Sequence, residues 1–173
     1  MFVRTKRFKN NEYAYLVQNR WTKKGTRQKA VKYLGKVICP LIILKTDEKT
    51  AKLLGIKELA KKSYKETLKS ILNQVVKELE FKNQKDISIN ISKFEVLLDG
   101  KPCVLKLKEG FFCGYTLKSL FNLKYVGQEK LDFGYKLAEG LLICGISLDK
   151  EIFVELCNKA FYEYEKKSRI SVS

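Results

Sequence analysis

The first 35 residues alternate between runs of strand-forming residues and short turn signals, and this pattern constrains the fold more than any other feature of the chain. The runs FVRTKRF (2–8), YAYLVQNRW (13–21) and TRQKAVKYL (26–34) are rich in aromatic and β-branched residues, which favour strands. Asn10 and Asn11 supply a turn after the first run, and Gly25, which tolerates positive φ, supplies one after the second. The sequence therefore predicts a three-stranded antiparallel meander that ends at Gly35.

A sheet of three short strands is marginal by itself, so we expect helices to cover it. The clearest helical pattern spans residues 63–81, where Ser63 and Glu66 have the spacing of a capping box. Other helical patterns follow the cap candidates Thr46, Thr116 and Ser147, and we expect helices over 47–54, 56–63, 117–123, 130–144 and 148–166.

Residues 87–99 predict one strand, and Asp99-Gly100 predicts a tight turn into a returning strand over 102–108. The predicted fold class is thus α+β, with a small three-stranded antiparallel basic sheet followed by a mostly helical domain with one β-hairpin. The predicted organisation is a basic nucleic-acid-binding module (1–37), an apolar connector (38–45) and an α+β domain for dimerisation or partner binding (46–168).

Positive charge is concentrated in the predicted meander. The formal net charge of the 173-residue chain is +16, and residues 1–36 hold eleven basic residues against one acid, Glu12. This fifth of the chain therefore carries most of the excess, which points to a polyanionic partner. A basic face that only meets solvent is the alternative interpretation.

The arginines sharpen this interpretation because lysine outnumbers arginine 30 to 5, yet four of the five arginines fall within the first 27 residues. Arginine is better than lysine at bidentate contacts to phosphates and guanine edges. The predicted nucleic-acid-binding residues are Arg4, Lys6, Arg7, Arg20, Trp21, Lys23, Lys24, Arg27, Lys29 and Lys32.

Aromatic residues lie among these cations and have two interpretations. Trp21, Tyr13 and Tyr15 could stack on bases, or they could pack the sheet against its support. We expect Tyr33, with Val31 and Leu34, to anchor the third strand to the body, while Trp21 stays open between hinge packing and stacking.

Several other classes of protein fit the sequence poorly. The chain has no histidine, no G-x-G-x-x-G or G-x-x-x-x-G-K-[ST] motif, and five scattered cysteines without a C-x-x-C pair. We therefore expect no metal, no cofactor and reduced cysteines that pack as small apolar residues. The sequence also shows no apolar run long enough to span a membrane and no secretory signal, which predicts a cytoplasmic protein.

The run NEYAYLVQNRWTKKGTRQKAVKYLGKV, following FVRTK, resembles the short β module at the start of some DDE-type insertion-sequence transposases. There an aromatic-rich strand, a basic turn with glycine, an R-Q-K/R segment and a closing Y-L-G follow one another; here these are residues 13–17, 23–25, 27–29 and 33–35. Short archaeal proteins carry a similar module. The resemblance covers about 36 of the 173 residues. It implies nucleic-acid binding and not transposition, since residues 46–168 offer no candidate carboxylate triad.

These observations predict a non-enzymatic nucleic-acid-binding protein that uses the basic N-terminal sheet, with double-stranded DNA favoured over RNA. A structured-RNA-binding or translation-associated factor is the alternative. A third is a metal-dependent enzyme acting on nucleic acid, with acids such as Asp99 or Asp132 brought together by the fold.

Overall fold

The computed structural model describes residues 1–40, 62–79, 86–108 and 110–170 of the chain. Within these ranges it contains seven strands and four helices: β1 (Phe2–Phe8), β2 (Asn11–Thr22), β3 (Gly25–Ile38), α3 (Tyr64–Lys77), β4 (Ile87–Asn90), β5 (Glu95–Leu98), β6 (Lys101–Leu107), β7 (Gly110–Phe112), α4 (Gly114–Phe121), α5 (Lys130–Ile143) and α6 (Lys150–Ile170). The α+β class is confirmed. The predicted helix over 47–54, most of the one over 56–63, and connector residues 41–45 lie outside the described residues.

The strands form a single mixed sheet in the order β1-β2-β3-β6-β5-β4, with β7 paired to β6. The predicted meander is present, but the prediction of a separate three-stranded sheet is wrong because β3 also pairs with β6. This pairing is parallel and joins residues 36–38 to residues 103–105. The expected end of the third strand at Gly35 is also wrong, because Val37 and Ile38 gain β6 as a neighbour and are buried there.

Gly35 has a different role, at the point where β3 passes β6. Its φ is +124°, and a Cβ atom at this position would lie 2.1 Å from the carbonyl oxygen of Pro102. Only glycine combines this backbone conformation with so close an approach to another backbone. The division of the chain into module, connector and domain stays a prediction.

The second half of the sheet contains more strands than the sequence predicted. Residues 87–99 form the hairpin of β4 and β5 instead of one strand, and the chain reverses around Phe94, whose φ is +55°. The turn at Asp99-Gly100 is confirmed, and both residues have the positive φ of a type I′ hairpin turn. The short strand β7 was not predicted.

The capping box of α3 is confirmed. Glu66 accepts hydrogen bonds from the backbone N–H of Ser63 at 2.9 Å and from its hydroxyl at 2.8 Å, and the Ser63 hydroxyl accepts from the Glu66 N–H. These hydrogen bonds hold the pKa of Glu66 below its usual value, with the backbone N–H of Ser63 as the main cause. This helix therefore begins where its sequence predicts.

Two other helices begin at residues different from those predicted. The N-cap of α4 is Cys113, so Thr116 lies inside the helix, where its hydroxyl donates to the Phe111 carbonyl at 2.6 Å. Helix α6 begins at Lys150, after Asp149, whose carboxylate accepts from the Glu151 N–H at 2.8 Å. Ser147 is therefore not its cap.

The buried face of α5 also differs from the prediction. The sequence repeat places Leu131, Tyr135, Ala138, Leu141 and Leu142 along one side of this helix. Of these, Leu141 is buried together with Phe133 and Leu137, whereas Leu131, Tyr135 and Leu142 are 64%, 68% and 60% exposed. The helix is apolar on two sides, so periodicity alone did not identify the side that faces the core.

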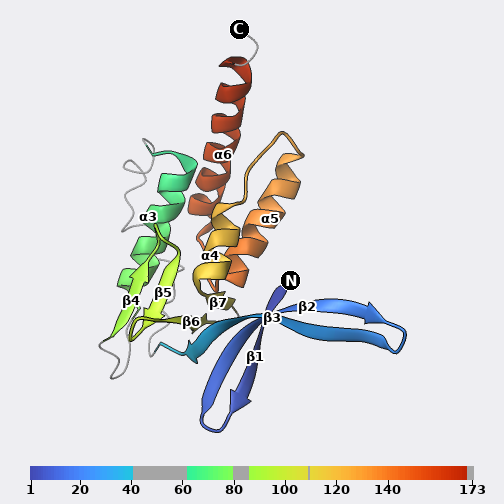
Figure 1. Ribbon diagram of the computed structural model, residues 1–173. Coiled ribbons are helices and arrows are strands. Elements are labelled where there is room, and N and C mark those ends of the chain that lie inside the picture. Colours follow the sequence, from blue (N-terminus) through green and yellow to red (C-terminus); the bar gives the residue numbers. More distant parts are fainter. Residues whose placement is uncertain (41–61, 80–85, 109, 171–173) are drawn as a thin grey trace.

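Two clusters of buried side chains hold the molecule together. The larger cluster joins the four described helices to residues of β3, β5, β6 and β7. The smaller one fixes the N-terminal strands to the body through Ala14, Leu16, Leu34, Val37, Val104 and Cys113. In Figure 1 the helices gather on one side, while the β1–β2 and β2–β3 hairpins extend from the sheet in two directions.

The five cysteines are unpaired, and four of them are buried. Burial raises the pKa of Cys103 and Cys157 to about 11 and that of Cys144 to about 12, so these thiols stay protonated near neutral pH. Among the described helices, none combines the length and the apolar character that a membrane crossing requires.

Candidate nucleic-acid interface

The N-terminal strands have an inner face that packs on the body and an outer face that does not. In an antiparallel pair, directly opposed residues project to the same face. The pairs Val3↔Leu16 and Thr5↔Ala14 define the inner face, where Ala14 and Leu16 are buried. The pairs Arg4↔Tyr15 and Lys6↔Tyr13 define the outer face.

On the outer face three tyrosines gather beside two cations, and we call Arg4, Lys6, Tyr13, Tyr15 and Tyr33 the tyrosine face. The ring centroid of Tyr33 lies 5.5 Å from that of Tyr15 and 6.3 Å from that of Tyr13. The ammonium group of Lys6 lies 5.9 Å from the Tyr15 centroid, within reach of a cation–π interaction. Partial burial, followed by the neighbouring tyrosines, raises the pKa of Tyr33, so its hydroxyl stays protonated near neutral pH.

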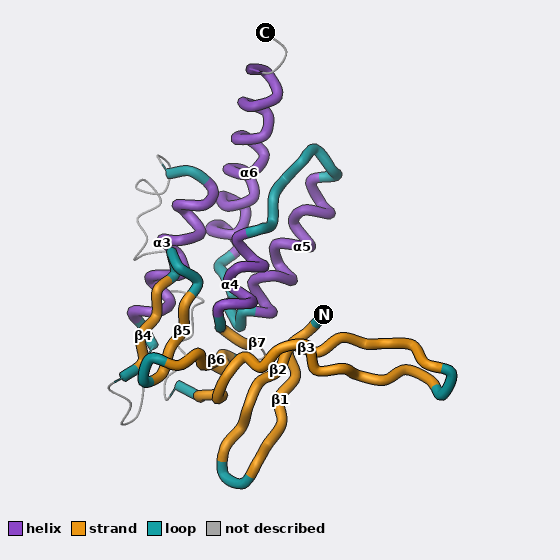
Figure 2. The backbone as a smooth tube through the Cα atoms, in the orientation of Figure 1, coloured by secondary structure: helices purple, strands orange, loops and turns teal. Residues whose placement is uncertain are grey.

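Beyond the tyrosines, β2 and β3 continue as a two-stranded ribbon that we call the distal ribbon (residues 18–29). Its register runs from Gln18↔Lys29 to Thr22↔Gly25, and every residue from 18 to 33 is exposed. Figure 2 shows this ribbon extending away from the helices. Both of its sides therefore face solvent, which is uncommon because a lone hairpin is marginally stable in water.

The distal ribbon carries five basic residues and no acid. Arg20 lies directly opposite Arg27, and the next pair on the same side of the ribbon is Gln18↔Lys29. Like charges opposed across a strand pair destabilise a hairpin, so folding alone does not favour this arrangement. Gln18, Arg20 and Lys29 line a shallow surface pocket of about 200 Å³. The arrangement is suited to holding an anion.

All ten predicted binding residues are exposed, but they do not form one continuous face. Arg4 and Lys6 belong to the tyrosine face, Arg7 is next to the β1–β2 turn, and Lys23 and Lys24 form the turn of the distal ribbon. Arg20, Arg27 and Lys29 project from the ribbon side that continues the inner face, and the register places Lys32 opposite Leu16 on the same side.

The exposure of the aromatic residues decides the open question on Trp21 and corrects the prediction for Tyr33. Trp21 is 83% exposed near the end of the ribbon, so the hinge-packing interpretation is wrong. Of the three predicted anchors, Leu34 is buried, but Val31 and Tyr33 are 50% and 53% exposed. The tryptophan and Tyr33 are therefore accessible to a ligand.

Sequence reasoning missed Tyr33 as a surface residue because two irregularities interrupt the alternation of β3. The register shifts between Ala14/Tyr15 and Leu16/Val17, where β3 carries one extra residue each time, Leu34 and Val31. Strict alternation puts Tyr33 on the side of Arg27 and Lys29, whereas the shifted register puts it opposite Tyr15. No local sequence signal marked these bulges.

The acids considered for an enzyme are widely separated. Asp99 lies in the turn between β5 and β6, and Asp132 lies in the first turn of α5; these two segments are far apart in Figure 1. Over the described ranges, no group of three or more cysteine, aspartate or glutamate side chains is arranged to hold a metal ion.

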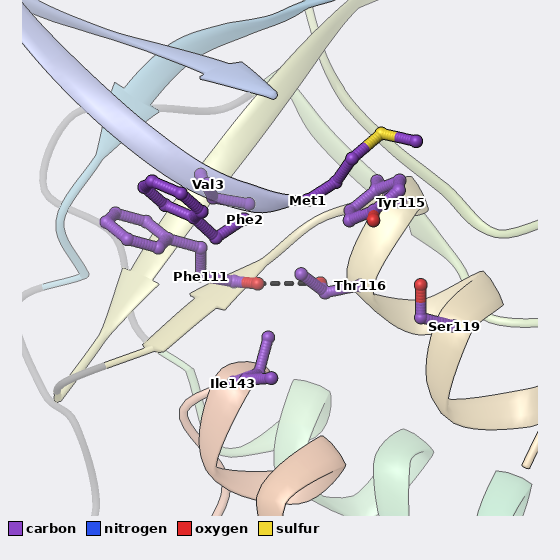
Figure 3. A pocket seen from close by; sticks show the side chains of 8 residues that line it. All are labelled: Met1, Phe2, Val3, Phe111, Tyr115, Thr116, Ser119 and Ile143. Atoms are coloured by element: carbon purple, nitrogen blue, oxygen red, sulfur yellow. Dashed lines mark hydrogen bonds between the residues drawn. The ribbon is translucent and has the colours of Figure 1, made fainter. Parts of the chain in front are cut away.

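A separate pocket of about 390 Å³ lies where the start of β1 meets β7, α4 and α5. Figure 3 shows its lining, which is mainly apolar, together with the Thr116 hydroxyl donating to the Phe111 carbonyl. Tyr115 is the one titratable side chain in this lining. Among the described residues of this lining, no side chain carries a charge that would bind an anion.

No family model, curated protein or solved structure matches this chain. The resemblance of residues 1–36 to the transposase module therefore stays a prediction.

Proposed function

We propose that this protein is a non-enzymatic nucleic-acid-binding protein that uses its N-terminal strands, with double-stranded DNA as the favoured ligand. The distal ribbon is the observation that carries the proposal. Its arginines are opposed, its charge is of one sign, and neither of its sides is covered. An anionic ligand would relieve the repulsion and cover the exposed surface.

The dimensions of the ribbon favour a DNA groove. Its five residue pairs span about 14 Å at roughly 3.4 Å per residue. The major groove of B-form DNA is about 12 Å wide and 8.5 Å deep and accepts a two-stranded ribbon, whereas the A-form groove of RNA is too narrow for side chains to read. Arg20 and Arg27 are suited to base edges, and Lys23, Lys24 and Lys29 are suited to phosphates.

The structured-RNA alternative draws on the tyrosine face, because aromatic side chains on an open sheet face are a common way to bind unpaired RNA bases. A cytoplasmic location belongs to the same proposal and agrees with the five unpaired cysteines, since a reducing compartment keeps thiols free.

Fluorescence anisotropy with labelled duplex DNA, single-stranded DNA and hairpin RNA tests the proposal. If the five lysines Lys6, Lys23, Lys24, Lys29 and Lys32 contact phosphates, the logarithm of the affinity falls with the logarithm of salt with a slope of about −4.5. Raising salt from 100 to 200 mM then weakens binding roughly 20-fold. An affinity that does not change with salt contradicts the proposal.

A matched pair of variants distinguishes the contribution of the ribbon's charge to binding from that of the overall net charge. Lys23→Ala/Lys24→Ala should weaken duplex binding and make the salt slope about two units shallower. Lys65→Ala/Lys69→Ala removes the same charge from exposed positions of α3 and should have a much smaller effect. Equal losses in both variants would show that net charge, and not the ribbon, drives binding. Cleavage of the labelled duplex when magnesium is added would favour the enzyme instead.

We also propose that residues 46–168 support weak self-association through α5. Leu131, Tyr135, Ala138 and Leu142 lie within one narrow sector of the helix, and three of them are strongly exposed. In an antiparallel pair of α5 helices, Leu131 would face Leu142 of the other copy and Tyr135 would face Ala138, which satisfies the self-complementarity of a two-fold interface.

A single 14-residue helix face buries less than the roughly 800 Å² per partner of a standard interface, so we expect a dimer only at micromolar or higher concentration. Sedimentation velocity over a concentration series measures this. Leu142→Ser should abolish the concentration dependence, while Ile143→Ser, at an exposed position off the stripe, should preserve it. Equal behaviour of the two variants would exclude this face.

A further inference from the structure

The outer face of the N-terminal strands continues from the tyrosine face onto the distal ribbon. Residues paired across the strands form successive rows on this face. The first three rows join β1, β2 and β3, and the last two join β2 and β3: Lys6–Tyr13–Lys36, Arg4–Tyr15–Tyr33, Phe2–Val17–Ala30, Asn19–Gln28 and Trp21–Thr26. The guanidinium group of Arg4 donates a hydrogen bond to the side-chain carbonyl of Gln28, which ties the two regions together. This face contains no acidic residue, because Glu12 pairs with Arg7 and projects to the inner side.

The tyrosine face is built differently from the ribbon. Its rows alternate rings with cations, and Tyr33 is 53% exposed in the centre of three rings. A buried core would use such rings for packing, and a surface that contacted only phosphates would not need them. Rings beside lysine and arginine on an open sheet are suited to stacking a base while the cations hold its phosphates.

Bases inside a duplex are stacked on each other and expose only their edges in the grooves. The tyrosine face therefore requires unpaired nucleotides, whereas the distal ribbon has the size and charge to occupy a duplex groove. Tyr15 and Trp21 lie on the same side of β2, six residues or about 20 Å apart. Arg20 and Arg27 project from the opposite side of the ribbon, and a groove that encloses the ribbon reaches both of its sides. One nucleic acid can therefore contact both regions at once.

We infer that the preferred ligand is a junction at which a DNA duplex continues into an unpaired strand, with the duplex on the distal ribbon and the unpaired bases on the tyrosine face. This inference rests on the proposed nucleic-acid binding and specifies its ligand. Tyr33 is the central stacking side chain, and Arg4 and Lys6 contact the phosphates of the unpaired strand.

Equilibrium binding of the full chain to three DNA probes tests the inference: a blunt duplex, the same duplex with a six-nucleotide unpaired tail, and the tail strand alone. Stacking on an aromatic side chain changes affinity by roughly 5- to 100-fold per base. We expect the tailed duplex to bind at least fivefold more tightly than the blunt duplex. A 2-aminopurine base in the tail should lose fluorescence on binding, as stacking requires.

Three variants separate stacking from other effects. Tyr33→Ala should remove the preference for the tailed duplex and the fluorescence loss, with the affinity for the blunt duplex unchanged. Tyr33→Phe keeps the ring and should retain both. Tyr162→Ala, which removes a tyrosine that is 68% exposed on α6, should behave as the original protein.

The outcomes distinguish this inference from the proposed function. Equal affinity of the original protein for blunt and tailed duplexes overturns the inference and leaves duplex binding intact. An equal loss of both affinities in Tyr33→Ala also overturns it, because that result would indicate a structural role. If the original protein binds none of the three probes, the proposed function fails as well.

Discussion

Replacing Gly35 by alanine tests the connection between the N-terminal strands and the body. A Cβ atom at this position would meet the backbone of Pro102 at 2.1 Å, and the φ of +124° disfavours any residue with a side chain. The obstacle is main chain, so no side-chain rotation relieves it. Strand β3 must therefore move away from β6, which weakens the pairing of residues 36–38 with residues 103–105.

Two contributions set the size of the effect. A non-glycine residue in a disfavoured positive-φ conformation costs about 1–3 kcal/mol. Losing two or three backbone hydrogen bonds between β3 and β6 costs about 1 kcal/mol each. The free energy of unfolding should therefore fall by about 3–6 kcal/mol. For a chain of this length, each kcal/mol shifts Tm by roughly 2–4 °C, so Tm should fall by about 6 °C or more.

Gly25→Ala is the matched control, because Gly25 also has positive φ (+98°) but a Cβ atom there has no neighbour within 4 Å. The free energy of unfolding of this variant should fall only by the cost of a non-glycine residue at positive φ, about 1–3 kcal/mol. Thermal and urea unfolding followed by circular dichroism measure both variants. If Gly35→Ala is no more destabilising than Gly25→Ala, the close approach of β3 to the backbone of Pro102 is refuted.

Three further predictions concern the body. Ser63→Ala should lower the free energy of unfolding by about 1 kcal/mol in urea titrations at pH 7. The difference should shrink a little as pH falls through the folded-state pKa of Glu66, because the variant loses the Ser63 hydroxyl, the smaller of the two hydrogen bonds that lower this pKa, and keeps the backbone N–H, the larger one. The Tyr64 hydroxyl is buried without a hydrogen-bond partner in the described part of the chain, so Tyr64→Phe should leave stability unchanged or raise it by about 1 kcal/mol; a clear loss would reveal a hidden partner. A thiol reagent at pH 8 should modify only Cys39 in the folded protein and all five cysteines in denaturant; rapid reaction of a second thiol would contradict the described burial.

The features that sequence predicted correctly are local. The three N-terminal strands, the turn at Asp99-Gly100 and the start of α3 at Ser63 depend on turn and capping chemistry within a few residues. Each of these signals acts without reference to the rest of the fold, so a single sequence is enough to identify it.

The features that sequence missed depend on distant partners. The pairing of β3 with β6 joins segments about 65 residues apart, and nothing in the sequence near Val37 indicates this partner. The same holds for α5, where Leu131, Tyr135 and Leu142 repeat as regularly as the buried Phe133, Leu137 and Leu141. Which of two apolar helix faces is buried is decided by the surface against which the helix packs.

The predicted binding residues fall between these cases. The exposure of the nine basic residues among them was expected from charge alone, since isolated lysine and arginine side chains are rarely buried, whereas the exposure of Trp21 was not. The position of Tyr33 beside Arg4 and Lys6, and not on the side of Arg27 and Lys29, follows from Val31, an extra residue of β3. A change of one residue in register reverses the face of every later side chain, so the sequence predicted which residues are exposed but not which of them share a face.

The distal ribbon should be the least stable part of the described sheet, and binding should change this. Opposed Arg20 and Arg27, exposure of both sides and an isolated hairpin geometry each weaken its backbone pairing. Hydrogen exchange of residues 18–29 should therefore be fast in the free protein, while the buried strand β6 exchanges slowly. A bound phosphate backbone would neutralise the opposed charges and cover the ribbon, so its exchange should slow by tenfold or more with β6 unaffected. Slowing confined to the body, with no change in residues 18–29, would show that the ligand binds elsewhere.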